Sequence, residues 1–187
     1  MSIHEKLSEA PDLRGLIVAL ADNPVEWVLA GSVAVLAWLP PPWPFMPGDI
    51  DVVPERSATN LERLARALET LTARPIHDPA WPASLSPEEC ERWTPWPAAE
   101  ERLNHRFETP LGQLDIVPRR AGLYEKLRPR SHALDAWGVR VWVADPEDLA
   151  ATMRPGRTKH ARRLALMGEI RGRSARGEAP CGLTRGA

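Results

Sequence analysis

The stretch "LAGSVAVLAWLPPPWPFMPGDIDVV", residues 29–53, holds the pattern that decides the fold of this chain. Residues 26–30 are short and apolar, which favours a buried strand, and the Gly-Ser pair that follows is typical of a strand-to-helix turn. Residues 31–39 predict a short helix, because the prolines after it cannot continue one. Residues 49–54, "DIDVVP", predict a second strand that a proline ends.

Outward from this stretch, the chain alternates helical and extended patterns. Residues 57–71 place four leucines on one helical face, with Ser57 as a candidate N-cap. Residues 104–119 predict a β-hairpin with Leu111 and Gly112 at its turn. Further elements are expected as helices at 12–22, 121–127, 146–153 and 158–170 and as a strand at 139–145. This order predicts an α/β (α+β) fold, a small mixed sheet with helices packed on it and a helical C-terminal segment.

The composition fits a globular protein of ordinary kind. The chain has 187 residues, of which 43% are hydrophobic and 26% charged, and its net charge of −1 gives no global case for nucleic-acid binding. Cys90 and Cys181 have no neighbours at metal-ligand spacing, which argues against a zinc site or a disulfide framework. No segment has the apolar length of a membrane helix or of a signal peptide. We therefore expect no membrane partner and a cytoplasmic location.

Three parts of the chain differ in composition. Residues 1–144 are expected to form the core, and within it residues 79–101 form an insert rich in proline and tryptophan. Residues 145–171 are expected to form the C-terminal helical segment, and residues 172–187, rich in glycine and arginine, a flexible tail. A local basic cluster in this C-terminal region consists of Arg154, Arg157, Lys159, Arg162, Arg163, Arg171 and Arg173.

Asp49 and Asp51 open the strand expected at 49–54. Residues two apart on a strand point to the same face, so these carboxylates repel each other unless a cation lies between them. Mg²⁺ suits them, since it takes oxygen ligands and keeps several waters. Asp115 adds a carboxylate on a later strand, and if the two strands are neighbours the three suit a two-magnesium site for phosphoryl displacement. The simpler alternative is a strand with one solvated face.

The Gly31-Ser32 turn is a candidate anion-binding site, which complements the metal-binding role predicted for the carboxylates. Free backbone N–H groups at the start of a helix bind anions such as phosphate, and glycine lets the backbone approach closely. The Ser32 hydroxyl can donate a hydrogen bond as well. Metal-binding carboxylates and a phosphate-binding turn together predict chemistry on a nucleoside triphosphate (NTP).

On these motifs the chain resembles the nucleotidyltransferase superfamily of the polymerase-beta type, whose signature is Gly-Ser, a short helix, Asp-x-Asp on a strand and a third Asp on a later strand. The segments "DIDVVPERSATNLERLARAL", "TPLGQLDIVPRRAGLYEKL" and "VRVWVADPEDLAATMRPGRTKHARRLALM" are similar to small bacterial proteins of the AbiEii type, over residues 26–167. The resemblance implies transfer of a nucleoside monophosphate from an NTP to a hydroxyl group, with release of pyrophosphate. In some members the acceptor is the 3′ end of tRNA, and members are often toxins with a cognate antitoxin protein as partner.

The resemblance implies a role for each residue of the predicted site. Asp49 and Asp51 would bind Mg²⁺, and Asp115 would bind metal or take the proton of the acceptor hydroxyl. Gly31 and Ser32 would hold the triphosphate. The nucleotide-facing cations implied are Arg157 and Lys159, with Lys126 or Arg154 supplying the charge of a family lysine that Met153 replaces. Further departures from the family pattern are Leu39-Pro40, Pro47-Gly48 and His160.

Three functions remain open at this point. An RNA acceptor needs basic residues beside the site, which the C-terminal cluster offers. A small amine-bearing acceptor, such as an aminoglycoside, needs additional acids, which the insert offers at Glu89, Glu91, Glu100 and Glu101. A catalytically inactive binding or regulatory protein with the same fold is the third, and the substitutions at Met153 and His160 argue for it.

Overall fold

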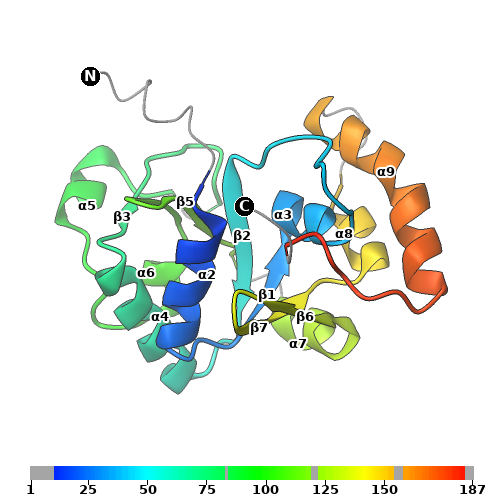
Figure 1. Ribbon diagram of the computed structural model, residues 1–187. Coiled ribbons are helices and arrows are strands. Elements are labelled where there is room, and N and C mark those ends of the chain that lie inside the picture. The colour runs from blue at the N-terminus through cyan, green and yellow to red at the C-terminus, as the bar shows by residue number, and fades with distance from the viewer. Residues whose placement is uncertain (1–10, 83, 119–121, 154–157, 184–187) are drawn as a thin grey trace.

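The computed structural model describes residues 11–82, 84–118, 122–153 and 158–183, the last range with backbone alone at 158–160 and 162 (Figure 1). The strands are β1 (Trp27–Ala30), β2 (Asp49–Pro54), β3 (Arg74–Pro75), β4 (Arg106–Thr109), β5 (Gly112–Ile116), β6 (His132–Ala136) and β7 (Val139–Val143). The helices are α2 (Leu13–Asp22), α3 (Gly31–Ala37), α4 (Ala58–Thr70), α5 (Pro87–Arg92), α6 (Glu100–Leu103), α7 (Leu123–Leu127), α8 (Pro146–Thr152) and α9 (Thr158–Ala175), with a 3₁₀ turn, η1, at Arg128–Arg130.

Strand β2 occupies the centre of the sheet. The described strands form one seven-stranded sheet in the order β3-β4-β5-β2-β1-β7-β6. β2 runs antiparallel to β1 and parallel to β5, and β1 runs parallel to β7, so the sheet is mixed as the sequence predicts. Along β2 the apolar residues Ile50 and Val52 are fully buried, whereas Asp49 and Asp51 on the other face are half-buried. The aspartates therefore share a face, as their spacing predicts.

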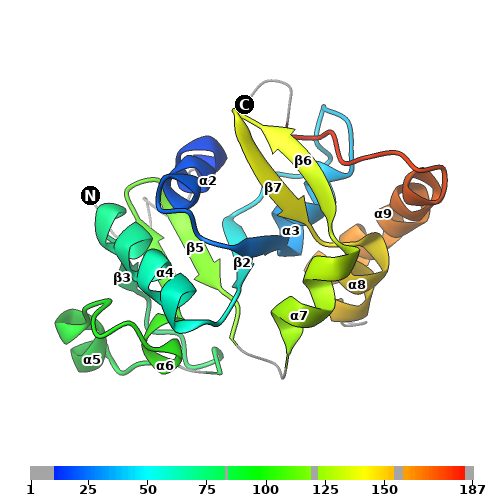
Figure 2. The same cartoon turned by 90° about the horizontal axis from the view of Figure 1, so that it is seen from below.

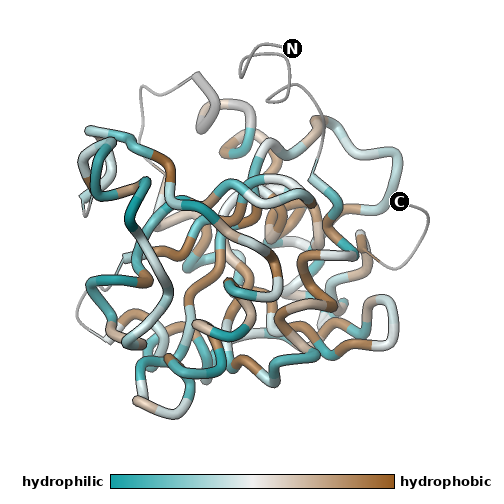
Figure 3. Tube along the Cα trace, turned by 90° about the vertical axis from the view of Figure 1, so that its left-hand side faces the viewer, coloured by the Kyte–Doolittle hydropathy of each residue, from teal (hydrophilic) through white to brown (hydrophobic). Residues whose placement is uncertain are grey.

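Helices pack on the sheet in two groups. α2 contacts α4, whereas α3 contacts α8 and α9; the first pair lies to the left of β2 in Figure 1 and the second group to its right. Figure 2 shows from below that α7 lies close to β1 and β2, which it contacts. Ser57 caps α4 by accepting a hydrogen bond from the Asn60 N–H, which confirms the predicted N-cap. The tube in Figure 3 places the most apolar segments in the interior and the most polar ones on loops and outer helix faces.

The β6–β7 hairpin contains a strand that the sequence pattern does not predict. Residues 132–136 read "HALDA", which is too polar to indicate a strand on its own. Trp137 and Gly138 both have positive φ, 52° and 81°, and so form the two-residue turn whose twist matches paired strands. The turn fixes the register Ala136↔Val139. β6 pairs with β7 on one side and is an edge strand of the sheet.

The C-terminal segment differs from the flexible tail expected from position 172. α9 continues to Ala175, and the N–H groups of Cys181 and Gly182 both donate to the Ala37 carbonyl at 2.8 Å. Leu183 is only 2% exposed and belongs to the core. The segment therefore supplies hydrogen-bond donors to the carbonyl of Ala37, the last residue of α3. No helix in the described part of the chain is both long and apolar enough to cross a membrane.

Candidate active site

The predicted carboxylates are brought together by the register of three neighbouring strands. Asp51 is the direct partner of Asp115 in the parallel β2–β5 pair, and Ala30 at the end of β1 is the partner of Asp51. Residues opposite one another in a sheet point to the same face, and Asp49 lies two residues before Asp51. The condition set by the sequence, that the two Asp-bearing strands are neighbours, is therefore met. Three carboxylates lie on one face, beside the start of α3.

Gly31 gives the carboxylate of Asp51 its space. The glycine has φ 61°, and a Cβ built there would lie 1.7 Å from Asp51 Oδ2 and 2.4 Å from its Cγ. No other residue type fits, because both the backbone conformation and the contact exclude a side chain. The sequence predicts that the missing side chain of Gly31 lets a phosphate group approach the backbone. The structure shows that the missing side chain also makes room for the carboxylate of Asp51.

Ser32 follows Gly31 and is fully buried. Its Oγ lies 3.4 Å from Asp49 Oδ1, a long hydrogen bond from a hydroxyl to a carboxylate. The observed role of this hydroxyl is thus to orient Asp49. A contact between Ser32 and a phosphate group stays a prediction.

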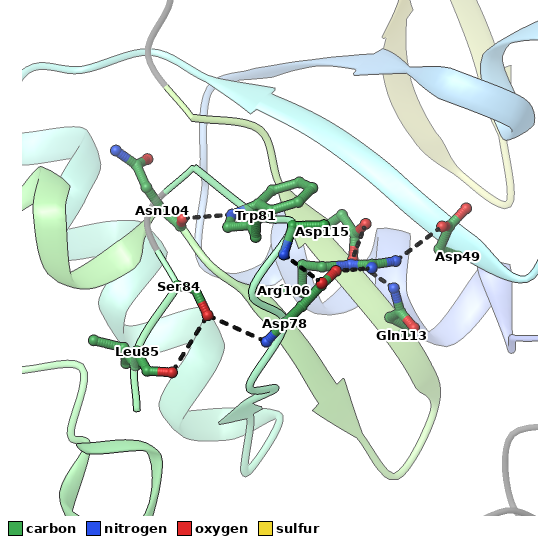
Figure 4. A network of polar contacts seen from close by, with 10 residues as sticks. Asp49, Asp78, Trp81, Ser84, Leu85, Asn104, Arg106, Gln113 and Asp115 are labelled. Carbon is green, nitrogen blue, oxygen red and sulfur yellow. Dashed lines mark hydrogen bonds and ion pairs between the residues drawn. The ribbon is translucent and has the colours of Figure 1, made fainter. Parts of the chain in front are cut away.

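Arg106, on β4, binds three carboxylates at once (Figure 4). Its Nη1 lies 2.6 Å from Asp78 Oδ2, its Nε 3.1 Å from Asp115 Oδ2, and its Nη2 3.7 Å from Asp49 Oδ2. The Arg106 side chain is 26% exposed, so the charge lies in a partly dehydrated position where such contacts are stronger than on an open surface. The guanidinium is the positive centre of this acidic face.

Asp115 is the most deeply buried of these acids, with a side chain only 3% exposed. Its Oδ2 accepts from Arg106, and its Oδ1 accepts from Gln113 Nε2 at 2.8 Å. Burial raises the pKa of Asp115 to about 6, and the charge of Asp49 adds to the increase, although the contacts with Arg106 and Gln113 oppose it. A carboxyl group with this pKa is suited to exchange a proton near neutral pH.

The charges of Arg106 and Asp78 stabilise each other. Burial alone would lower the pKa of the Arg106 guanidinium, but the carboxylates of Asp115, Asp78 and Asp49 outweigh it and the pKa rises. The hydrogen bond from Arg106 in turn lowers the pKa of Asp78 below its usual value. Both side chains are therefore ionised at neutral pH, and the pair is a permanent part of the site.

The Pro/Trp-rich insert contributes directly to this face. Asp78 lies just before it, and its N–H donates to Ser84 Oγ at 3.3 Å while its Oδ1 accepts from the Ala80 N–H at 2.9 Å. The Trp81 ring lies near the Arg106 guanidinium, 5.5 Å from centroid to Cζ, and its Nε1 donates to the Asn104 carbonyl at 2.9 Å. Figure 4 shows these groups arranged around Arg106. The insert is thus attached to the candidate site by polar contacts as well as by packing.

The predicted basic residues are not all placed at this face. Lys126 is an exposed residue of α7, a helix that borders Val53 and Pro54, at the opposite end of β2 from Asp49. Arg157, like Arg154, lies outside the described residues. Lys159 belongs to α9, of which only the backbone is described at that position. Their contact with a nucleotide stays a prediction.

Arg106 and Asp78 are residues of this site that the sequence argument missed. The predicted turn at Leu111 and Gly112 is wrong by one residue, because the hairpin turns at residues 110–111 and Gly112 already pairs with Thr109. The observed register places Arg106 opposite Asp115, whereas the predicted turn would have placed it opposite Val117. No local signal marks Asp78, which reaches Arg106 across 28 residues of chain.

The acidic face has the ligand chemistry of a magnesium site. Asp49 and Asp51 offer oxygen atoms from one strand face, and Mg²⁺ commonly binds one or two carboxylates and completes its shell with water and phosphate. Within the described residues, however, no three or more His, Cys, Asp or Glu side chains converge as a metal-binding group. Asp49 and Asp115 instead converge on the guanidinium of Arg106. A magnesium site at Asp49, Asp51 and Asp115 therefore stays a prediction, and Asp49 and Asp51 are the pair whose strand face offers it the most direct ligands.

Comparison with known proteins gives matches at the level of structure alone. No family model and no curated protein matches the chain. The solution structure of the antibiotic-resistance factor ANT(2″)-Ia is similar with a TM-score of 0.48 at 15% identity, over 94% of this chain and 96% of that chain. A crystal structure of ANT(2″)-Ia in complex with adenylyl-2″-tobramycin is similar with a TM-score of 0.48 at 16% identity, over 87% of this chain and 96% of that chain.

Proposed function

We propose that this protein is a magnesium-dependent nucleotidyltransferase that moves a nucleoside monophosphate from an NTP to a hydroxyl acceptor. The observation that carries the proposal is the register of β2 and β5, which sets Asp51 opposite Asp115, with Asp49 on the same face. The Gly31 turn beside them supports it, because the glycine is shaped to the Asp51 carboxylate. This is the arrangement that the motif resemblance implies.

Asp49 and Asp51 would hold the metal, with Ser32 orienting Asp49 through the 3.4 Å contact. Bound Mg²⁺ would supply positive charge to the triphosphate and favour departure of pyrophosphate. The chain's own part is to fix the two carboxylates before the metal arrives. The Gly31 contact and the buried Ser32 hydroxyl perform this task for Asp51 and Asp49 respectively.

Asp115 would act as the base toward the acceptor. The acceptor hydroxyl gives its proton to Asp115, its oxygen bonds to the α-phosphorus, and the bond from that phosphorus to the pyrophosphate oxygen breaks. The burial that raises the pKa of Asp115 makes it a better proton acceptor than an exposed aspartate. Gln113 and Arg106, which hold its two oxygens, would fix its direction.

The acceptor belongs to one of two chemical classes. The basic C-terminal cluster favours RNA, including the tRNA 3′ end of an AbiEii-type toxin, for which a cognate antitoxin would be a partner. The acids Asp49, Asp78 and Asp115, which lie together around Arg106, favour a small amine-bearing acceptor of the aminoglycoside kind. Both classes use the same metal and base chemistry.

The direct test uses the purified chain with each radiolabelled NTP, Mg²⁺ and, in separate reactions, total tRNA or a panel of aminoglycosides. We expect metal-dependent transfer of label to one acceptor class and release of pyrophosphate. Absence of both transfer and metal-dependent NTP binding would reject the enzyme and favour the alternative, an inactive binding or regulatory protein of the same fold. NTP binding without transfer to any acceptor would favour that alternative too.

A further inference from the structure

We propose that Arg106 is an internal cation that competes with the divalent metal for Asp49, and that Asp78 is a positioning residue that holds this guanidinium away from the metal. The proposal rests on the proposed function, since it concerns the same acidic face. It assigns a role to Asp78, which lies outside the carboxylate motif, and it predicts the direction in which each residue changes metal affinity.

The contacts of Arg106 are unequal in length. The Asp78 contact is 2.6 Å and is a charge-assisted hydrogen bond, whereas the Asp49 contact is 3.7 Å and is an ion pair without a hydrogen bond. The third contact, 3.1 Å from Nε to Asp115, uses a different edge of the guanidinium. A cation that binds Asp49 would therefore break the longest of the three contacts, while Arg106 keeps the other two.

Asp78 is fixed independently of Arg106. Its Oδ1 accepts the Ala80 N–H at 2.9 Å, which leaves Oδ2 to Arg106, and its own N–H donates to Ser84 Oγ. The Trp81 ring also lies against the guanidinium. Asp78 thus draws the guanidinium toward the insert, which is the direction away from Asp49 (Figure 4).

Two opposite effects on metal affinity follow from this geometry. Removing the Asp78 charge frees Nη1 and leaves Asp49 and Asp115 as the remaining acidic partners of the guanidinium, so the metal meets a stronger competitor. Removing the Arg106 charge takes the competitor away, so the metal binds Asp49 without competition from the guanidinium. A residue of purely structural importance would weaken metal binding in both variants.

The experiment is a titration of the full chain with Mn²⁺, as a spectroscopic substitute for Mg²⁺, followed by electron paramagnetic resonance without nucleotide. We expect Asp78→Asn to weaken Mn²⁺ binding about fivefold to tenfold and Arg106→Met to tighten it by a similar factor. The double variant should bind like Arg106→Met, because Asp78 acts only through Arg106. The matched control is Asp135→Asn, which removes an exposed acid that pairs with Arg140 at 2.9 Å and should change nothing.

Several outcomes would overturn the proposal. Unchanged or tighter binding by Asp78→Asn contradicts it, and a double variant that binds more weakly than Arg106→Met would make Asp78 a metal ligand instead. If Arg106→Met does not fold, Arg106→Gln replaces it, and the decisive result stays with Asp78→Asn, whose side chain is already 24% exposed. A wild-type chain that binds no Mn²⁺ overturns the proposed metal site as well, whereas equal affinities in all variants overturn only the competition.

Discussion

The carboxylate of Asp51 lies where a side chain at Gly31 would begin, 1.7 Å from the ideal Cβ position to Asp51 Oδ2. Gly31 thus directly follows β1 and opens α3 with a positive φ, and at the same time it makes room for an acid of the neighbouring strand. The contact joins the Gly-Ser motif and the Asp-x-Asp motif into one structural unit.

Gly31→Ala should therefore both destabilise the protein and damage the site. The added Cβ incurs the cost of positive φ, about 1 kcal/mol, and must also displace Asp51. We expect a loss of about 2–4 kcal/mol in the free energy of unfolding, measured in urea, with weaker Mn²⁺ binding. Gly138→Ala is the matched control, because Gly138 also has positive φ, 81°, but a Cβ there meets nothing within 4 Å. Equal losses in the free energy of unfolding of the two variants would show that the overlap with Asp51 adds nothing to the destabilisation.

Asp49→Ala should abolish nucleotide transfer and leave the fold intact. The side chain is half-buried and its observed partners, Ser32 and Arg106, are both held by the surrounding structure. Removing a metal carboxylate typically costs several kcal/mol of transition-state stabilisation, roughly a thousandfold or more in rate. Transfer of labelled NTP and the far-ultraviolet circular dichroism spectrum provide the two measurements. Asp135→Ala, an exposed acid on β6, serves as the control that should retain full activity.

The contribution of Asp115 to the stability of the metal-free protein should fall as the pH rises from about 4 to 7. The pKa of Asp115 is about 6 in the folded protein, above its ordinary value of 3.8, so the folded state binds a proton that the unfolded state has lost. The contribution is complete below the unfolded pKa and is lost as the pH rises through the folded pKa. Asp115→Asn should remove this dependence and stabilise the protein by about 2–3 kcal/mol at pH 7.

Urea unfolding in the presence of a chelator, at pH values between 4 and 8, measures this difference. Asp49→Asn provides a comparison, since its carboxylate is more exposed than that of Asp115. A wild-type protein and an Asp115→Asn variant with parallel pH profiles would contradict the raised pKa.

Leu183→Ala should destabilise the protein by about 2–4 kcal/mol, because Leu183 is 2% exposed and belongs to the core cluster. If Leu183 belonged to a flexible tail, the same substitution would leave the free energy of unfolding unchanged. Met46→Ala, which shortens a side chain that is 66% exposed, is the control and should change stability by less than about 0.5 kcal/mol. Thermal or urea unfolding of the two variants distinguishes a packed segment from a free one.

Much of the central fold could be predicted because its signals are local. The helix that ends before the prolines, the Ser57 cap and the "DIDVVP" strand each follow from neighbouring residues. The hairpin at 104–119 was also predictable, but its register was not, because the turn lies one residue earlier than predicted and this shift is what places Arg106 opposite Asp115. The β6 strand was not predicted because residues 132–136 are too polar to indicate a strand, and no residue pattern marks Trp137 for the positive φ of the turn.

The sequence by itself determined that Asp49 and Asp51 share a strand face, since that follows from a two-residue repeat, and that Asp115 lies on a second strand. Only the tertiary structure decided that this strand is the parallel neighbour of β2, because strand pairing depends on packing between residues far apart in the chain. It also decided that the acids converge on Arg106 with Asp78 as a further partner. A single guanidinium can reach three carboxylates only where the sheet and the insert have already brought them within a few ångströms, and no local pattern specifies that distance.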